Sequence, residues 1–219
     1  MLEKIVYNQL LNFLNDNKII TKRQSGFRKY HSTETALLQT TNKYLMNMDR
    51  GLINGVLFLD LKKAFDTVDH KILLAKLELY GVQGVALNFF KSYLTNRSQL
   101  CTVQGTNSQL KKIKCGVPQG SNLGPLLFSL YINDLPNCLE QTEASMFADD
   151  TNISSIGNSP ADIEVKLNND LYNVNNWLIA NKLTLNLKKT EFMLIASKRK
   201  LKHFSYDPCI LIGNHNIKQ

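Results

Sequence analysis

The segment Phe147-Ala148-Asp149-Asp150 places two adjacent carboxylates among residues that favour β-strands. Apolar residues lead into the pair and Thr151 and Ile153 follow it, which predicts a short β-hairpin with both acids at its tip. Side chains alternate across a strand, so the two acids should point to opposite sides unless the turn rotates one of them. Their mutual repulsion would be relieved by a bound cation. An isolated Asp-Asp pair is most often a plain polar turn, so the rest of the chain decides between these interpretations.

A third acid follows a predicted buried strand earlier in the chain. The apolar run 56–59 predicts that strand, and Asp60 comes directly after it. A charge at the end of a buried strand is costly without a partner, so Asp60 should bind something or reach water. Taken alone, Asp60 is equally well explained as a helix cap or a turn residue.

Apolar periodicity and capping residues predict a series of helices. They cover residues 2–16, 33 to about 50, 70–79, 84–94, about 126–131, and a long helix that starts at Ser159-Pro160. A strand is predicted at 191–195, and a hairpin is predicted from strands 99–104 and 110–117 around Gly105–Ser108. The order predicts a βαββαβ arrangement, an α+β fold in which helices back an antiparallel sheet.

In a βαββαβ arrangement, the end of the first strand lies beside the tip of the central hairpin. Asp60 and Asp149 would then converge from distant parts of the sequence. Two such carboxylates can hold two Mg²⁺ ions about 3.5–4 Å apart, the spacing used for in-line phosphoryl transfer. Oxygen ligands of this kind suit Mg²⁺, which completes its shell with water and substrate phosphates.

Charge and composition favour an intracellular protein with an anionic partner. Lysine and arginine outnumber aspartate and glutamate by 26 to 18, which gives a net charge of +8. Such an excess favours nucleic acid over a membrane as the partner. The four cysteines show no metal spacing, and we find no signal peptide or membrane-length apolar run. We therefore expect the protein in the nucleus, the cytoplasm or both.

Two loops carry residues suited to binding. The loop 24–33 contains Arg28, Lys29 and His31, which either contact a phosphate backbone or form an ordinary solvated surface. In the loop 115–121, glycines flank a Pro-Gln pair, and glycine leaves room for a substrate to approach the backbone. Gln119 offers both a donor and an acceptor there. A plain turn before a helix is the alternative explanation for this second loop.

A series of motifs runs through the chain in a definite order. They are Gln24–Arg28 with His31–Thr33, Phe58–Asp66, Gly116–Ser121, Leu123–Phe128, Tyr131–Leu135, Phe147–Asp150 and Asn186–Thr190. Each motif alone is weak evidence, but their order and spacing are specific. Together they are similar to the reverse transcriptase domain of non-LTR retrotransposons, especially the jockey-like lineages, over nearly the whole chain. The similarity implies a polymerase palm.

The similarity also implies roles for the acids and for one lysine. Asp60 would contact both metal ions, Asp149 would be its metal-binding partner, and Asp150 would be the third acid. Lys189 matches the lysine near the triphosphate and would act as general acid for pyrophosphate. Lys188 is the competing assignment for that role.

Further positions match substrate contacts of the family. Phe65, five residues after Asp60, matches the steric gate that excludes a ribonucleotide 2′-hydroxyl, and Gln119 matches the residue beside the incoming nucleotide. The implied nucleotide-binding set is Ala64, Phe65, Gln119 and Gly120. The implied nucleic-acid-binding set is Arg28, Lys29, Gly116 and Pro118.

By the same similarity, residues 1–55 are a partial fingers region, 56–196 are the palm with embedded fingers elements, and 197–219 are a basic tail. The family pattern has a basic fingers segment upstream and a primer grip and thumb downstream, so we expect a chain truncated at both ends. Such a chain should polymerise poorly alone because it cannot clamp a primer–template. Processive full-length synthesis would contradict that expectation.

The implied function is RNA-directed DNA polymerase, with an RNA template, a DNA primer and dNTPs as partners and no membrane. The implied cofactor is two Mg²⁺ ions, with Mn²⁺ as the alternative. An inactive nucleic-acid-binding fragment, decayed or domesticated, is the competing interpretation. An RNA-templated RNA polymerase is the nearest enzymatic alternative, against which Phe65 argues. The sequence does not indicate the oligomeric state.

Overall fold

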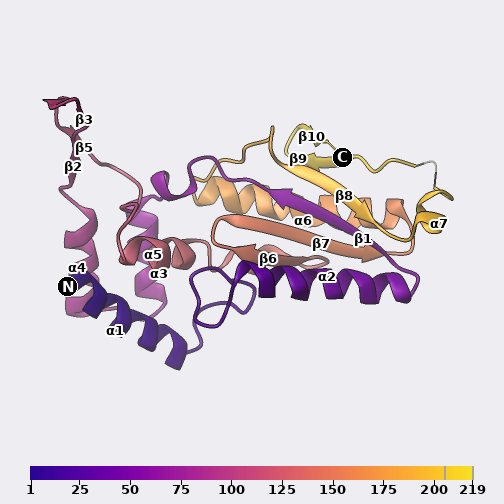
Figure 1. Cartoon of the computed structure of the whole chain (residues 1–219), viewed down its shortest axis with the longest axis horizontal. Helices are drawn as coiled ribbons and strands as arrows, with labels where there is room; N and C mark the ends of the chain where they lie inside the picture. The colour runs from indigo at the N-terminus through magenta and orange to yellow at the C-terminus, as the bar shows by residue number, and fades with distance from the viewer. Residues whose placement is uncertain (205, 219) are drawn as a thin grey trace. The chain divides into compact units, whose positions relative to one another are not determined.

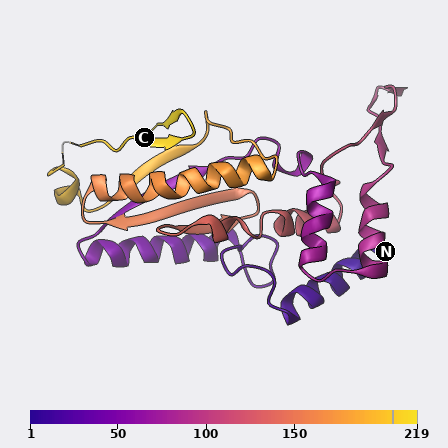
Figure 2. The ribbon, with the colours of Figure 1, turned by 180° about the vertical axis from the view of Figure 1, so that it is seen from behind.

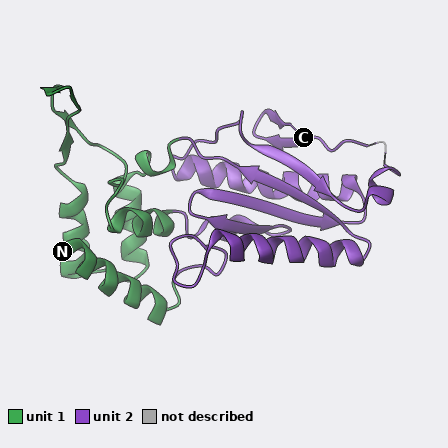
Figure 3. Ribbon diagram, in the orientation of Figure 1, with its two compact units in different colours: residues 1–19, 63–131 green, residues 20–62, 132–219 purple. Residues whose placement is uncertain are grey.

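The computed structural model describes residues 1–204 and 206–218. The chain forms two compact units, shown in different colours in Figure 3. Unit 1 contains residues 1–19 and 63–131, and unit 2 contains residues 20–62 and 132–219. The three acids and Lys189 all belong to unit 2. These boundaries divide the chain by packing, whereas the division predicted from the sequence concerns polymerase subdomains.

Unit 2 is built on a four-stranded sheet in the order β6-β7-β1-β8 (Figure 1). All three strand pairs are antiparallel, which confirms the predicted antiparallel sheet. The strand β1 extends further toward the N-terminus than the apolar run suggested, and it includes the buried Asn54, whose Oδ1 accepts a hydrogen bond from Asn47 Nδ2 at 2.7 Å. The strands are β1 (Ile53–Leu59), β6 (Glu143–Phe147), β7 (Asp150–Gly157) and β8 (Glu191–Ile195).

Both outer strands of this sheet are covered by other parts of unit 2. Along β6, Ser25 N donates to Met146 O at 2.8 Å, and Met146 N donates to Arg23 O at 2.8 Å. Along β8, Phe192 N donates to Lys218 O at 2.9 Å. Backbone groups at both edges of the sheet are therefore hydrogen-bonded.

The helix α6 (Pro160–Ala180) lies across one face of the sheet, as Figures 1 and 2 show from opposite sides. Ser159 caps it as predicted, because its hydroxyl accepts a hydrogen bond from Asp162 N at 3.2 Å. Ile163 approaches so closely that a Cβ at Gly55 would lie 2.2 Å from its Cγ2 atom. Glycine at position 55 therefore allows the helix to contact β1.

The other elements of unit 2 surround this core. The helix α2 (Thr33–Asp49) contacts β1 and β6, and Ser32 and Thr35 form a capping box at its start. After the short helix α7 (Lys198–Leu201), the chain forms a hairpin of β9 (Ile210–Ile212) and β10 (His215–Ile217), which packs on α6. The sequence did not indicate this hairpin. A 3₁₀ turn, η2 (Leu135–Cys138), precedes β6.

Unit 1 is mainly helical, and most of the predicted helix bounds are confirmed there. Asp69 caps α3 by accepting from Lys71 N and Ile72 N, as predicted. Nearly every residue of α5 is buried, which makes it the centre of the unit. The helices are α1 (Leu2–Asp16), α3 (His70–Leu79), α4 (Gly84–Leu94) and α5 (Leu123–Tyr131), with a 3₁₀ turn η1 (Ala64–Asp66).

The predicted hairpin over 99–104 and 110–117 is wrong in its extent and its turn. The structure pairs β2 (Ser98–Gln99) with β5 (Lys111–Lys112) and β3 (Thr102–Val103) with β4 (Thr106–Asn107). The turn is Gln104-Gly105, where both residues have positive φ, rather than Gly105–Ser108. All four short strands are exposed, so there is no buried face to extend the pairing.

Among residues 1–204 and 206–218, no helix has the combination of length and apolar character needed to span a membrane.

Candidate active site

The turn between β6 and β7 carries the acidic pair. Phe147 pairs with Asp150, so Ala148 and Asp149 are the two central residues of a tight turn. Ala148 has a φ of 56°, in the left-handed region that is costly for residues other than glycine. The predicted hairpin is confirmed, with the difference that only one of the two acids, Asp149, lies in the turn, while Asp150 is the first residue of β7.

Asp60 lies at the end of β1 next to this turn. The register pairs Leu59 with Thr151, and one further step along the antiparallel strands brings Asp60 opposite Asp150. Its backbone is fixed from the other side by the segment that carries Lys189. Asp60 N donates to Thr190 Oγ1 at 3.4 Å, and Asp60 O accepts from Asn186 N at 2.8 Å.

The carboxyl group of Asp150 is affected by burial and by the two neighbouring acids. The pKa of Asp150 is raised above its ordinary value of 3.8, first by burial and then by the negative charges of Asp149 and Asp60. Among the described residues, no set of three or more His, Cys, Asp or Glu side chains forms a ready-made metal site. Carboxylates that repel one another at the end of two neighbouring strands nevertheless fit a divalent cation, which would offset the repulsion.

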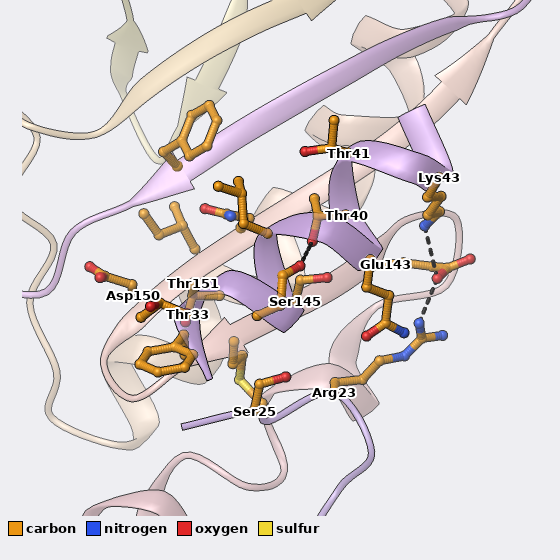
Figure 4. A pocket seen from close by; sticks show the side chains of 18 of the residues that line it. Arg23, Ser25, Thr33, Thr40, Thr41, Lys43, Glu143, Ser145, Asp150 and Thr151 are labelled. Carbon is orange, nitrogen blue, oxygen red and sulfur yellow. Dashed lines mark hydrogen bonds and ion pairs between the residues drawn. The ribbon is translucent and has the colours of Figure 1, made fainter. Parts of the chain in front are cut away.

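A groove of about 890 Å³ extends from these acids along the sheet, between α2 and the strands (Figure 4). The strand register explains which side chains of the sheet line the groove. Because side chains alternate along a strand, Asp150 and Asn152 lie on the same face of the sheet as their partners Phe147 and Ser145. Of the predicted site residues, three line it: Asp60, Asp150 and Lys189. The lining also includes three basic residues that the sequence had not singled out: Lys22, Arg23 and Lys43.

Glu143 forms ion pairs with two of these basic side chains. Arg23 Nη1 lies 2.6 Å and Lys43 Nζ lies 3.0 Å from Glu143 Oε2, and Figure 4 shows this cluster toward the end of the groove away from Asp150. Burial raises the pKa of Glu143, but the hydrogen bonds and charges of Lys43 and Arg23 outweigh it and lower the pKa below 4.5. No local pattern in the sequence indicated this cluster, whose members are as many as 120 residues apart.

Replacing Glu143 with Gln should remove an acid-sensitive part of the stability. Because its folded-state pKa is lowered, ionised Glu143 stabilises the fold above pH 4.5, and this contribution disappears as the pH falls through the folded-state pKa. The three side chains are about half exposed, so we expect a loss below about 1 kcal/mol. Urea unfolding at about pH 7 and about pH 3 measures it. The difference from wild type should vanish at acidic pH, and the exposed Glu140→Gln serves as the control.

Arg28 and Lys29 lie in the loop before α2. The Arg28 guanidinium donates to Thr21 O at 3.2 Å and to Gln24 O at 3.0 Å, so it stabilises the loop itself. Lys29 is exposed, with its Nζ 4.9 Å from the centre of the Tyr30 ring. A phosphate contact of either residue stays a prediction.

The predicted nucleotide-binding residues belong to unit 1, and so do Gly116 and Pro118 of the predicted nucleic-acid-binding set. Gln119 Nε2 donates to Asp66 Oδ1 at 2.9 Å, and Val117 N donates to Phe65 O at 2.9 Å. Gly116 has a φ of 90°, and a Cβ there would lie 2.8 Å from Asp66 O. The loop that contains Pro118 is therefore packed against η1.

The remaining members of this set differ in exposure. The Phe65 ring stacks on Phe128 with 4.4 Å between ring centres, and it is half-buried. Ala64 is buried at the start of η1, whereas Gly120 is exposed with a φ of 78°. Unit 1 thus holds the sequence-predicted nucleotide set together, and unit 2 holds the acids together.

Solved structures share this fold. The chain is similar to apo telomerase from Candida tropicalis with a TM-score of 0.62 and 16% identity, over 89% of this chain and 41% of that one. It is also similar to telomerase from Candida albicans in complex with a fragment of telomeric RNA, with a TM-score of 0.59 and 15% identity, over 98% and 35% of the two chains. These similarities confirm the predicted α+β fold class.

Sequence comparisons identify closer relatives. Over 158 residues the chain is 36% identical to the RNA-directed DNA polymerase from mobile element jockey of Drosophila melanogaster, covering 69% of this chain and 17% of that protein. Over 202 residues it is 27% identical to the probable RNA-directed DNA polymerase from transposon X-element of the same species, covering 90% and 22%. The chain spans less than a quarter of the length of these relatives. The family model for reverse transcriptase (RNA-dependent DNA polymerase) matches residues 1–214. The chain therefore belongs to the reverse transcriptase family.

Proposed function

We propose that this chain carries the catalytic palm of an RNA-directed DNA polymerase encoded by a non-LTR retrotransposon. The reaction would join a dNTP to the 3′-hydroxyl of a DNA primer paired with an RNA template, releasing pyrophosphate. The observation that supports it best is the placement of Asp60 and Asp150 at adjacent ends of β1 and β7, beside Asp149. Burial and the charges of Asp149 and Asp60 raise the pKa of Asp150 there.

The three acids are proposed to hold divalent cations. Mg²⁺ is the expected ion, two per site, with Mn²⁺ as the alternative, because carboxylate oxygens are hard ligands. Such ions, when bound, favour deprotonation of the primer hydroxyl and neutralise charge on the pyrophosphate. Hydrogen bonds to Asn186 and Thr190 hold the backbone of Asp60 in place. Its carboxylate would therefore need little rearrangement to bind a cation.

Lys189 is proposed to donate the proton that the pyrophosphate takes up, with Lys188 as the alternative donor. In support, Lys189 lines the same groove as Asp60 and Asp150. Its backbone is held by the hydrogen bond from Lys189 N to Asn186 O at 2.9 Å. Arg28, Lys29, Gly116 and Pro118 are proposed to contact the template–primer.

The groove beside the acids is proposed to receive part of the nucleic acid. Its basic residues, together with the net charge of +8, favour a phosphate backbone. We assign 1–55 and 197–219 to the fingers and to the approach to the thumb, with the palm between them. With RNA and dNTPs as substrates, the proposed site of action is the nucleus, the cytoplasm or both.

Single-nucleotide incorporation tests this function without requiring processivity. The chain, in excess over an RNA template annealed to a DNA primer, should add the complementary dNTP when Mg²⁺ or Mn²⁺ is present. EDTA should abolish the reaction, and a non-complementary dNTP should be a poor substrate. The contrary result is a chain that binds the template–primer yet incorporates no more nucleotide than the Asp60→Asn, Asp149→Asn double variant. That result would favour a non-catalytic nucleic-acid-binding protein.

Replacing Phe65 with Val should relax the choice of sugar. The proposed role of Phe65 is steric, so a smaller side chain admits a 2′-hydroxyl that the ring excludes. We expect the ratio of rNTP to dNTP incorporation to rise by on the order of 10–100-fold, equivalent to about 1–3 kcal/mol of discrimination. Loss of the stack on Phe128 should also destabilise the fold. The conservative Phe65→Tyr should retain the wild-type ratio. An unchanged ratio in Phe65→Val would remove the gate assignment.

A further inference from the structure

Gln24 holds the turn that carries Asp149. Its side chain is buried, with an exposed fraction of 1%. Nε2 donates to Ala148 O at 3.1 Å, while Oε1 accepts from Ala148 N at 3.0 Å and from Gly26 N at 2.7 Å. One carboxamide therefore satisfies both backbone groups of the residue that immediately precedes Asp149.

The backbone around Gln24 is fitted to the same turn. Ser25 N and Arg23 O are hydrogen-bonded to the two backbone groups of Met146, which attaches the loop to β6 on either side of Gln24. A Cβ on Gly26 would lie only 2.2 Å from Ala148 N. Glycine is therefore required where the loop passes over the turn, and the Gln24 carboxamide is held rigidly against it.

The turn needs such support because of its composition. Tight hairpin turns with positive φ favour Asn, Asp or Gly, yet Ala148 stands here with a φ of 56°. That conformation costs about 1–2 kcal/mol for a residue with a Cβ. Hydrogen bonds to both of its backbone groups offset this cost. They also fix the orientation of the peptide group that joins Ala148 to Asp149.

We propose that Gln24 is a positioning residue that holds the Ala148–Asp149 peptide so that the Asp149 carboxylate faces a divalent cation. The proposal rests on the proposed function, since it assumes that Asp149 is a ligand. It adds a buried amide, 124 residues before Ala148 in the sequence, to the groups on which that ligand depends. Both the donor and the acceptor of the amide are needed.

Two substitutions separate hydrogen bonding from volume. Gln24→Met keeps the length of the side chain and removes both functions. Gln24→Glu keeps the shape, and its neutral form has one donor and one acceptor, whereas its ionised form has no donor for Ala148 O. Burial favours the neutral form, since the side chain at position 24 is almost fully buried. The Glu variant should therefore resemble wild type increasingly as the pH falls.

The first readout is Mn²⁺ binding to the full 219-residue chain, measured by electron paramagnetic resonance. Gln24→Met should weaken it by on the order of 10–100-fold, the usual effect of losing a group that orients a metal ligand. The second readout is single-nucleotide incorporation, in which the maximal rate should fall by a similar factor. The dissociation constant of the template–primer should not change.

The third readout is the pH profile of the Gln24→Glu rate divided by the wild-type rate. The ratio should rise as the pH falls from about 8.5 to about 6, while the ratio for Gln24→Met stays flat. Dividing by the wild-type rate removes the titration of neighbouring groups that both proteins share. The charged side chains of the loop and the turn, which are the same in both proteins, are Arg23, Arg28, Asp149 and Asp150.

Asn47→Leu is the matched control, because it also removes a buried carboxamide from unit 2, at a site on α2 that bonds to Asn54. It should lower stability without weakening Mn²⁺ binding by the folded protein. Wild-type Mn²⁺ affinity in folded Gln24→Met, or a flat pH ratio for Gln24→Glu, would overturn the proposal. If wild type incorporates no nucleotide but Gln24→Met still weakens Mn²⁺ binding, the proposed function fails and the positioning role stands. Absence of Mn²⁺ binding by wild type would overturn both.

Discussion

Asp60→Asn should reduce RNA-templated nucleotide incorporation by on the order of 10³-fold, the upper range for losing one preorganised electrostatic group. The amide keeps the size of the side chain but loses the charge that a cation requires. The backbone contacts to Asn186 and Thr190 remain, so the variant should stay folded. Template–primer affinity should change little, because binding depends mainly on basic residues.

The same substitution should not destabilise the protein. The negative charge of Asp60 contributes to the raised pKa of Asp150. A carboxyl group with a raised folded-state pKa lowers stability as the pH rises from its unfolded value of 3.8 through that folded pKa. Removing the charge of Asp60 lessens this penalty, so the free energy of unfolding near neutral pH should be equal to or above that of wild type.

Single-turnover incorporation, fluorescence anisotropy with labelled template–primer and urea unfolding measure these three quantities. Asp49→Asn is the control, since Asp49 is an exposed acid at the end of α2 in the same unit. It should match wild type in all three. Incorporation by Asp60→Asn within about tenfold of wild type would contradict the assignment of this acid to the catalytic site.

Asp170→Ala should cause the largest loss of stability, about 3–5 kcal/mol, because several buried donors lose their acceptor. Asp170 is 1% exposed on the inner side of α6. Its carboxylate accepts from Glu140 N at 3.0 Å, from Gln141 N at 2.9 Å, and from Thr142 N and Oγ1 at 2.8 and 2.6 Å. These bonds join α6 to the segment that leads into β6.

Urea unfolding measures this loss, with the neighbouring exposed Asn169→Ala as the control. Asp170→Asn should fall between the two, because its single carbonyl oxygen still accepts while its amino group faces backbone donors. A loss below about 1 kcal/mol in Asp170→Ala would show that water replaces the carboxylate at these donors.

Local signals in the sequence were enough to predict most helices and the central sheet. Capping by Ser32, Asp69 and Ser159 follows from side-chain chemistry within one helical turn, and all three caps are present. The short apolar run before Asp60 correctly indicated a buried strand. The acids could be placed side by side because the βαββαβ order fixes which strand ends are neighbours.

Interactions between distant segments were not visible in the sequence. Asp170 looked like any polar residue of a long helix, although it is the acceptor for four hydrogen bonds. Gln24 formed part of a family motif, but nothing nearby in sequence indicated that its amide binds Ala148. The hairpin of β9 and β10 was missed because strands of three residues are too short to show a clear alternation, and they gain stability from packing on α6.

The covered outer strands of the unit 2 sheet have a consequence for solubility. An unpaired strand edge is a template for another chain, and such edges promote aggregation. Here the loop at 23–25 occupies the edge of β6, and Lys218 reaches the edge of β8. Changes that detach either segment should therefore lead to self-association of the chain as well as to a loosened fold.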